Sequence, residues 1–144
     1  MSFVLDQLIP RPHRCEPGEG FFILNENTRI TAPQEANAAA ELLRSALNKM
    51  LLTPISPSAI SKPQAKDGDI VFVTDETAAA ESYRLRITPD QMIISGDPAG
   101  MFYAVQTLRQ MMLVDIVHIF PQQNYQLPCC ELEDAPRFQW RGFI

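Results

Sequence analysis

The sequence has few of the residues that build disulfide scaffolds or metal sites. Its 144 residues include three cysteines, two histidines, six glycines and one tryptophan. Three cysteines cannot all pair, and their spacing relative to the histidines is not typical of a zinc site, so neither a disulfide framework nor a metal centre is expected. We expect Cys15, Cys129 and Cys130 to be buried or half-buried thiols.

Long apolar runs and an excess of positive charge are also absent. No run approaches the roughly 20 residues of a membrane-spanning helix, and residues 1–6 lack the basic and apolar regions of a signal peptide. The net charge is −5, with nine scattered arginines and three lysines, which argues against a broad nucleic-acid surface. A hydrophobic fraction of 46% in a chain of this length predicts a soluble domain with one main core.

Two segments have the periodicity of amphipathic helices. The first runs from Pro33 to Leu52, and Thr31 with Gln34 resembles a capping box at its start. The second begins with Asp97 as N-cap and Pro98 as the first helical residue. The apolar side of the second helix is predicted to consist of Met101, Phe102, Val105, Leu108, Met111 and Met112.

Several short segments have the composition of strands. Residues 69–73 form a continuous apolar run typical of a buried strand, and residues 83–87 alternate between apolar and polar side chains. Further strands are expected at 21–24, 28–31, 92–94 and 114–120, and an extended stretch from residue 125, with 83–87 and 92–94 forming a hairpin. The order predicts an α+β fold, a mostly antiparallel sheet with two helices packed on one face. The core should bury together Leu43, Leu47, Phe72, Leu85, Val105 and Leu108.

No catalytic constellation is visible in the sequence. There is no glycine-rich phosphate loop, G-x-S-x-G elbow or H-E-x-x-H motif. His13 and His118 are interpreted as structural. The carboxylate pairs Asp67/Asp69 and Glu131/Glu133 would each share one face of a strand, and we interpret both pairs as solvated surface.

Four segments together resemble one enzyme family. Residues 134–138, Asp-Ala-Pro-Arg-Phe, followed by Trp140-Arg141-Gly142, resemble the opening of the catalytic barrel of family 20 glycoside hydrolases, the β-N-acetylhexosaminidases. Residues 9–12 resemble that family's "IP-x-P" lead-in, and residues 81–87 its "E-x-Y-x-L-x-I" strand. Residues 100–110 resemble its "G-x-F-Y-G-x-Q-T-L-x-Q" helix, with Ala104 where glycine is usual. The order matches over nearly the whole chain.

The resemblance implies a domain organisation and an activity for the parent protein. Residues 1–132 would be the non-catalytic N-terminal α+β domain, and residues 133–144 the start of a (β/α)8 barrel, cut within its first strand. Such enzymes release terminal N-acetylhexosamine from glycans by substrate-assisted, retaining hydrolysis, for which the family uses no cofactor. The catalytic Asp-Glu pair belongs further downstream, so residues 1–144 contain no catalytic residue and should be inactive.

The resemblance also implies one substrate-binding residue and a set of partners. Arg141 matches the family's arginine that binds hydroxyls of the terminal sugar in the intact enzyme; otherwise it is a salt-bridging strand residue. Arg137 and Phe138 would have a structural role at the junction between the N-terminal domain and the barrel. The expected partners are the protein's own catalytic barrel and, through the parent enzyme, a glycan, with no nucleic acid or membrane. Self-association through residues 134–144 and a periplasmic or secreted location are further expectations.

Two other interpretations of the sequence stay open. One is a similar accessory domain of another glycosidase, of the α-glucuronidase or O-GlcNAcase type. The other is a free-standing interaction module that uses the same fold. The run Pro-Arg-Phe-x-Trp-Arg-Gly at residues 136–142 favours family 20 over both.

Overall fold

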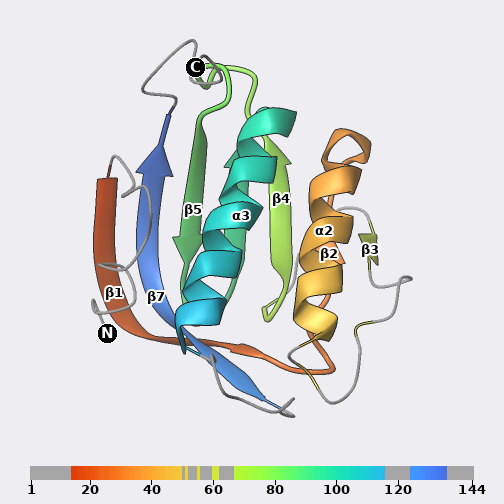
Figure 1. The fold of residues 1–144 in the computed structure, drawn as a ribbon, viewed down its shortest axis with the longest axis vertical. Helices are drawn as coiled ribbons and strands as arrows, with labels where there is room; N and C mark the ends of the chain where they lie inside the picture. The colour runs from red at the N-terminus through yellow and green to blue at the C-terminus, as the bar shows by residue number, and fades with distance from the viewer. Residues whose placement is uncertain are drawn as a thin grey trace, which may run out of the picture.

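The computed structural model describes residues 14–49, 51, 55, 60–61, 67–115 and 124–135, arranged as a sheet with two helices across one face (Figure 1). The strands are β1 (Arg14–Leu24), β2 (Ile30–Thr31), β3 (Ile60–Ser61), β4 (Ile70–Thr74), β5 (Tyr83–Ile87), β6 (Met92–Gly96) and β7 (Tyr125–Asp134). The helical segments are a 3-10 turn η1 (Gln34–Ala36), α2 (Asn37–Asn48) and α3 (Pro98–Asp115).

The strands pair in the order β1-β7-β5-β6-β4-β2-β3. The ladders β1–β7, β7–β5 and β5–β6 are antiparallel and contain most of the paired residues, whereas β6–β4, β4–β2 and β2–β3 are parallel. The predicted hairpin of residues 83–94 is the β5–β6 pair, and the predicted strand at 69–73 is β4, displaced by one residue. The α+β class is therefore confirmed.

Four strands of the sheet run in the same direction, and both helices lie on one face. The strands β2, β4, β6 and β7 all run in the same direction, because β5 is antiparallel to both β6 and β7. Helix α2 follows β2 and precedes the edge strand β3, and α3 connects β6 to β7. Both helices lie across the same face of the sheet, as Figure 1 shows.

The first helix is shorter than its sequence pattern predicts. The segment from Pro33 begins as η1, and α2 ends at Asn48, whose side-chain Oδ1 accepts a 2.7 Å hydrogen bond from the backbone N–H of Ile55. The capping-box prediction is wrong: neither Pro33, before η1, nor Ala36, before α2, makes a side-chain cap. Thr31 is unavailable for capping because it pairs with β4 as the last residue of β2.

The second helix starts as predicted and is tied to the loop before β5. The Asp97 carboxylate accepts hydrogen bonds from the backbone N–H groups of Gly100 at 2.7 Å and Glu81 at 2.9 Å. A side chain at Gly100 would overlap the backbone carbonyl of Ser82, so only glycine permits this approach. The predicted strand at 114–120 is wrong at its start, because α3 continues to Asp115; residues 116–120 lie outside the described residues.

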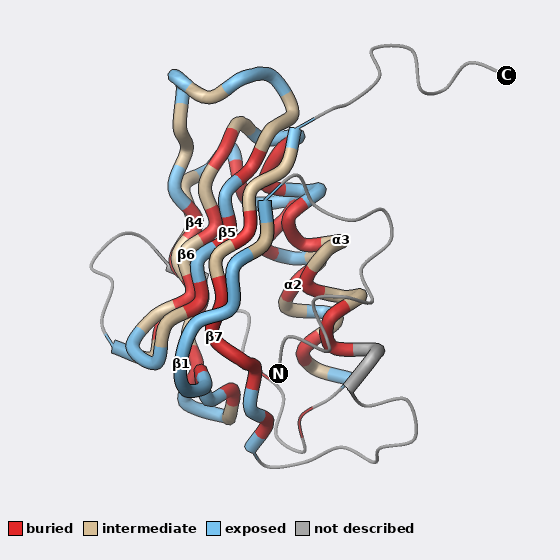
Figure 2. Tube along the Cα trace, turned by 90° about the vertical axis from the view of Figure 1, so that its left-hand side faces the viewer, coloured by how far each residue is buried: buried red, intermediate tan, exposed pale blue. Residues whose placement is uncertain are grey.

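The core fills the space between the helices and the sheet (Figure 2). The six residues predicted to be buried together all belong to it, with exposed fractions of 3% or less: Leu43, Leu47, Phe72, Leu85, Val105 and Leu108. Strand β5 has the predicted alternation, since Tyr83, Leu85 and Ile87 are buried whereas Arg84 and Arg86 are exposed. The opposite face of the sheet, here called the open face, carries no helix among the described residues.

The cysteine prediction is confirmed within the described residues. Cys129 and Cys130 are buried, Cys15 is half-buried, and none of these three described residues is in a disulfide. Burial raises the pKa of Cys130 to about 12, with smaller contributions from Cys15, Cys129 and Glu131, and burial also raises the pKa of Cys129. Both thiols of β7 therefore stay protonated at neutral pH and act as small apolar side chains.

Several predictions concern residues that the structure does not describe. These are the lead-in at 9–12, His13, His118, and the tail from 136 to 144 with Arg137, Phe138, Trp140 and Arg141. The proposed boundary after residue 132 falls within β7, because Glu133 and Asp134 still pair with Arg84 and Tyr83 of β5. The seven-stranded sheet therefore extends to Asp134.

Candidate functional site

Of the two carboxylate pairs singled out from the sequence, Asp67 is exposed as expected, whereas Asp69, Glu131 and Glu133 form ion pairs. Asp69 is 2% exposed and accepts two hydrogen bonds from Arg29, at 3.1 Å from Nε and 2.7 Å from Nη2. Its assignment to solvated surface is therefore wrong, because the Arg29 guanidinium compensates the buried carboxylate. Glu131 and Glu133 do share one face of β7, where arginines from both neighbouring strands contact them.

These arginines and glutamates form two charged rows across the open face. Arg14, Glu133 and Arg84 stand opposite one another on β1, β7 and β5, and Glu16, Glu131 and Arg86 form the next row. Glu133 accepts contacts at 3.1 Å from Arg14 and 2.8 Å from Arg84. The hydrogen bond and charge of Glu16 raise the pKa of Arg14, with smaller contributions from Glu133 and Glu131. This part of the open face is a solvated network in which the arginines of β1 and β5 pair with the glutamates of β7.

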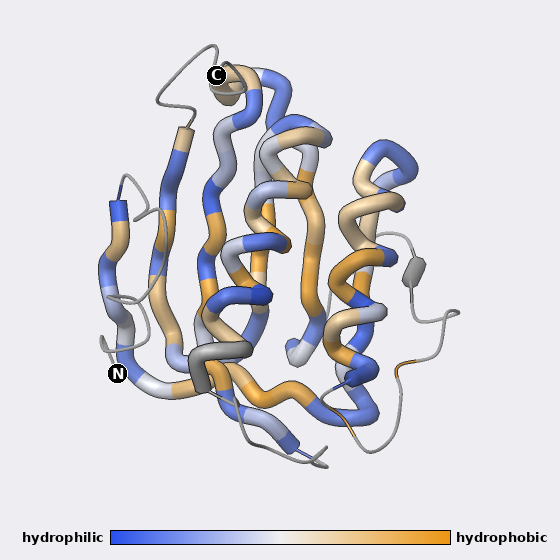
Figure 3. Tube along the Cα trace, viewed as in Figure 1, coloured by the Kyte–Doolittle hydropathy of each residue, from blue (hydrophilic) through white to orange (hydrophobic). Residues whose placement is uncertain are grey.

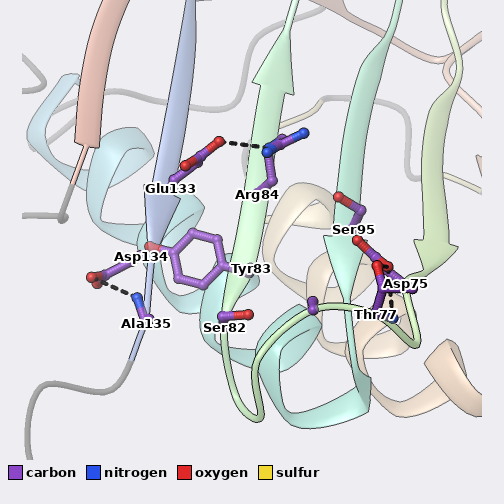
Figure 4. Close-up of a pocket in the computed structure, with 10 residues that line it drawn as sticks. Asp75, Thr77, Ser82, Tyr83, Arg84, Ser95, Glu133, Asp134 and Ala135 are labelled. Carbon is purple, nitrogen blue, oxygen red and sulfur yellow. Dashed lines mark hydrogen bonds and ion pairs between the residues drawn. The ribbon is translucent and has the colours of Figure 1, made fainter.

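A shallow pocket of about 340 Å³ lies at the end of the open face nearest Ala135 (Figure 4). Its walls come from the loop between β4 and β5 and from the ends of β5, β6 and β7, and they include Asp75, Thr77, Ser82, Arg84, Ser95 and Glu133. A glycosidase acid needs a raised pKa. Here the hydroxyl and backbone N–H of Thr77, followed by the charge of Arg84, lower the pKa of Asp75, and Glu133 is paired with two arginines. Neither Asp75 nor Glu133 therefore has the environment of a catalytic acid.

The lowered pKa of Asp75 gives a testable pH dependence. Because the folded-state pKa lies below the ordinary value of 3.8, ionised Asp75 stabilises the turn above that value, and this contribution is lost as the pH falls through the folded pKa. Thr77→Val removes the hydroxyl donor that lowers the pKa of Asp75 most, so this pKa should rise toward 3.8. A carboxyl ¹³C NMR titration measures it, with exposed Ser45→Ala as control. An ordinary pKa in the unmodified chain would contradict the assignment.

Two of the family-like motifs meet at a packing seam between β5 and α3. Glu81 and Ser82 contact the start of α3, through Asp97 and Gly100 respectively. About two turns further along the helix, the hydroxyl groups of Tyr83 and Thr107 lie 2.6 Å apart in a hydrogen bond. These motif residues therefore join the helix to the sheet and carry no visible catalytic role.

Phe102 and Tyr103, in the same helix motif, remain exposed. They are 40% and 38% exposed, and their rings meet edge to face with centroids 6.5 Å apart. The prediction that Phe102 lines the buried side of the helix is wrong. The buried stripe of α3 runs through Met101, Ala104, Val105, Leu108, Met111 and Met112, and position 102 lies about 100° around the helix from position 101.

The composition of α3 differs from that of an ordinary surface helix. Helix α2 has one buried apolar stripe, and its outer side carries the ion pair of Glu41 with Arg44 at 2.8 Å. In α3, residues 98–105 contain no charged side chain, and Arg109 is the only charged residue between positions 98 and 112. Figure 3 shows the hydrophilic residues of α3 gathered beyond its first two turns. A helical segment without charged residues on any side is typical of a segment that is covered on all sides. The uncharged stretch 98–105 contains Phe102 and Tyr103, so this absence of charge is a sequence signal for the exposed aromatic pair.

Within the described ranges, no metal or membrane site is found. No group of three His, Cys, Asp or Glu side chains there could hold a metal ion. Neither described helix is long and apolar enough to cross a bilayer. Arg141, the predicted sugar-binding residue, is outside these ranges, so the structure does not bring it into any site.

Comparisons with known proteins identify the family of this domain. The model of glycosyl hydrolase family 20, domain 2, matches residues 6–135. The β-hexosaminidase of Porphyromonas gingivalis is 26% identical over 95% of this chain, and β-hexosaminidase subunit A2 of Dictyostelium discoideum is 33% identical over 52%. The chain spans 18% and 14% of these two relatives.

A solved structure agrees with the family match. The GH20 β-N-acetylhexosaminidase of Streptomyces coelicolor A3(2) is similar over 95% of this chain and 28% of its own length, with 27% identity and a TM-score of 0.78. The match therefore covers nearly all of the present chain and about a quarter of the relative. By sequence and by fold, the chain belongs to glycosyl hydrolase family 20, in which it corresponds to domain 2.

Proposed function

We propose that this chain is the non-catalytic N-terminal domain of a β-N-acetylhexosaminidase. The observation that carries the proposal is the family match over residues 6–135, which covers both motifs of the packing seam. The relatives named above are hexosaminidases, and this chain spans between 14% and 28% of their lengths. In the parent enzyme, a (β/α)8 barrel would carry the active site and remove terminal N-acetylhexosamine from glycans.

The role assigned to the domain is structural support of that barrel. Half-buried Asp97 caps α3, and buried Asp69 pairs with Arg29. Of the carboxylates at the pocket, Asp75 has a lowered pKa and Glu133 is paired with arginines. General acid–base catalysis needs a carboxyl group whose pKa is matched to proton transfer. The domain therefore supplies a rigid sheet and two helices, and the chemistry belongs to the barrel.

Chain 1–144 is expected to be inactive against N-acetylhexosaminides. A chromogenic N-acetylglucosaminide measures this directly, because hydrolysis releases a coloured phenolate. Turnover should stay at the rate of the buffer blank, whereas the parent protein, expressed from the continuing gene, should hydrolyse the substrate. Turnover that scales with the concentration of chain 1–144 and persists after a second purification would contradict the proposal.

Arg141 keeps its proposed role in the intact enzyme. Its planar guanidinium presents fixed donors that suit neighbouring sugar hydroxyls. A periplasmic or secreted location, and self-association of chain 1–144 through residues 134–144, also remain proposals of the family resemblance. Two other interpretations followed from the sequence, an accessory domain of a different glycosidase and a free-standing module. The match to family 20 favours neither of them.

A further inference from the structure

The pocket at the end of the open face has no part in the function proposed above. Its volume of about 340 Å³ lies at the lower end of the range for small-molecule sites. All of its walls are described residues, which come from the loop between β4 and β5 and from the ends of β5, β6 and β7. Figure 4 shows polar side chains from these separate elements around one space. The chemistry of those side chains indicates what the pocket binds.

Arg84 and Ser95 supply hydrogen-bonding groups that no described residue uses. They stand opposite each other on β5 and β6, so their side chains lie on the same face of the sheet. Arg84 contacts Glu133 through Nε at 2.8 Å, whereas its Nη1 and Nη2 form no hydrogen bond with a described residue. The hydroxyl group of Ser95 likewise has no hydrogen-bond partner among the described residues. The pocket therefore presents the edge of a guanidinium beside a hydroxyl group.

Asp75 supplies an acceptor on another wall of the pocket. The backbone N–H and the hydroxyl group of Thr77 both donate to Oδ1 of Asp75, at 3.0 and 2.6 Å. The second oxygen, Oδ2, therefore keeps lone pairs for a ligand. The charge of Arg84 contributes to the lowered pKa of Asp75, so the carboxylate and the guanidinium lie within electrostatic reach of each other. Such a pair can accept a hydrogen bond from one ligand hydroxyl group and donate to the next.

The rim of the pocket is held in place by the surrounding structure. Glu81 in the loop before β5 has a φ of 64°, a left-handed conformation that costs free energy for a residue other than glycine. Its backbone N–H donates to Asp97 at 2.9 Å, and the neighbouring Ser82 carbonyl occupies the space that a side chain at Gly100 would need. Strained residues that their surroundings fix in this way are typical of ligand sites. A rigid rim also lowers the entropic cost of binding.

The charge around the pocket decides which class of ligand fits. Three carboxylates, of Asp75, Glu133 and Asp134, border the space together with the single guanidinium of Arg84. This excess of negative charge disfavours phosphate, sulfate and carboxylate ligands. No group of three carboxylates in the described part of the chain could hold a metal ion. Neutral hydroxyl groups both donate and accept hydrogen bonds, so they match mixed donors and acceptors without bringing in a charge.

We propose that this pocket binds a neutral sugar unit through a pair of neighbouring hydroxyl groups. The hydroxyl oxygens accept hydrogen bonds from Nη1 and Nη2 of Arg84, and one of the hydroxyl groups donates to Oδ2 of Asp75. Ser95 contributes its own hydroxyl group from β6. The site takes a single ring because the pocket is small and shallow. This binding goes beyond the supporting role given to the domain and does not depend on the activity of the barrel.

The test is an NMR titration of ¹⁵N-labelled chain 1–144 with methyl β-D-glucopyranoside, a neutral sugar. Amide shifts should saturate with a dissociation constant on the order of 10 mM, since the pocket is open to solvent. They should be confined to the loop between β4 and β5 and to the ends of β5, β6 and β7. Methyl β-D-glucuronide differs only by a carboxylate at C6, and it should bind at least about threefold more weakly.

Two substitutions on β5 separate the pocket from the charged rows. Arg84→Gln removes the proposed donors and should raise the dissociation constant at least about fivefold. Arg86→Gln is the matched control. The Arg86 side chain is 59% exposed where that of Arg84 is 61% exposed, and it also contacts a glutamate of β7, but it does not line the pocket. The control should change the dissociation constant less than about twofold, and the unshifted part of each spectrum reports whether the variant is folded.

Any of four results would overturn the proposal. They are shifts that do not saturate, saturating shifts elsewhere in the domain, equal weakening by the two substitutions, and glucuronide binding at least as tight as that of the glucoside. None of these measurements involves hydrolysis. The hexosaminidase activity of the parent protein is judged by its own assay, so failure of the sugar site and failure of the proposed function are distinguishable.

Discussion

Gly100→Ala is expected to destabilise the domain by about 3 kcal/mol, or about 10 °C in unfolding temperature, although alanine ordinarily favours a helix by about 1 kcal/mol. The added methyl group would overlap the carbonyl of Ser82. The start of α3 would then have to move away from β5, which weakens both hydrogen bonds to Asp97. The expected loss combines overpacking with partial loss of the helix cap.

The same substitution elsewhere provides the control. A methyl group at Gly18 would meet the atoms of Cys129 at 3.4 Å, which is ordinary contact. Gly18→Ala should therefore leave the unfolding temperature nearly unchanged. Equal behaviour of the two alanine variants, measured by thermal unfolding, would mean that α3 and the loop before β5 are not in contact.

Leu108→Ala should cost about 2–5 kcal/mol of folding free energy, the second large effect. Leu108 is fully buried in the core that the helices share with the sheet, so truncation leaves a cavity in addition to the lost transfer free energy. Urea unfolding measures the change. Leu42→Ala serves as control, because Leu42 is only partly buried at the edge of that core and its truncation opens to solvent. A loss below about 0.5 kcal/mol at Leu108 would contradict its central position.

The sequence predicted those elements whose patterns are local. The alternation of residues 83–87 gave the face of β5 correctly, and Asp97 with Pro98 marked the start of α3. The apolar stripe of the first helix identified Leu43 and Leu47 as core residues. In each case the periodicity of side chains along one element decides which side is buried, and that periodicity is visible in the sequence.

The errors arose where distant contacts decide the outcome. Asp69 was interpreted as solvated because its partner, Arg29, lies 40 residues away in the sequence, directly before β2. Thr31 was interpreted as the cap of the first helix, although it is the last residue of β2 and pairs with β4. Phe102 was counted as core because six apolar residues within twelve positions left its side of the helix ambiguous.

Sequence alone determined the α+β class, the two helices and the hairpin. It also suggested membership of glycosyl hydrolase family 20, through four motifs in the family's order. Tertiary structure decided the order of the strands, the charged rows on the open face and the exposure of Phe102 and Tyr103. It also showed why the motifs contain Gly100 and Tyr83, which meet Ser82 and Thr107 across the seam. The physical reason is that periodicity fixes burial within an element, whereas pairing between elements depends on the free energy of contacts that no local pattern encodes.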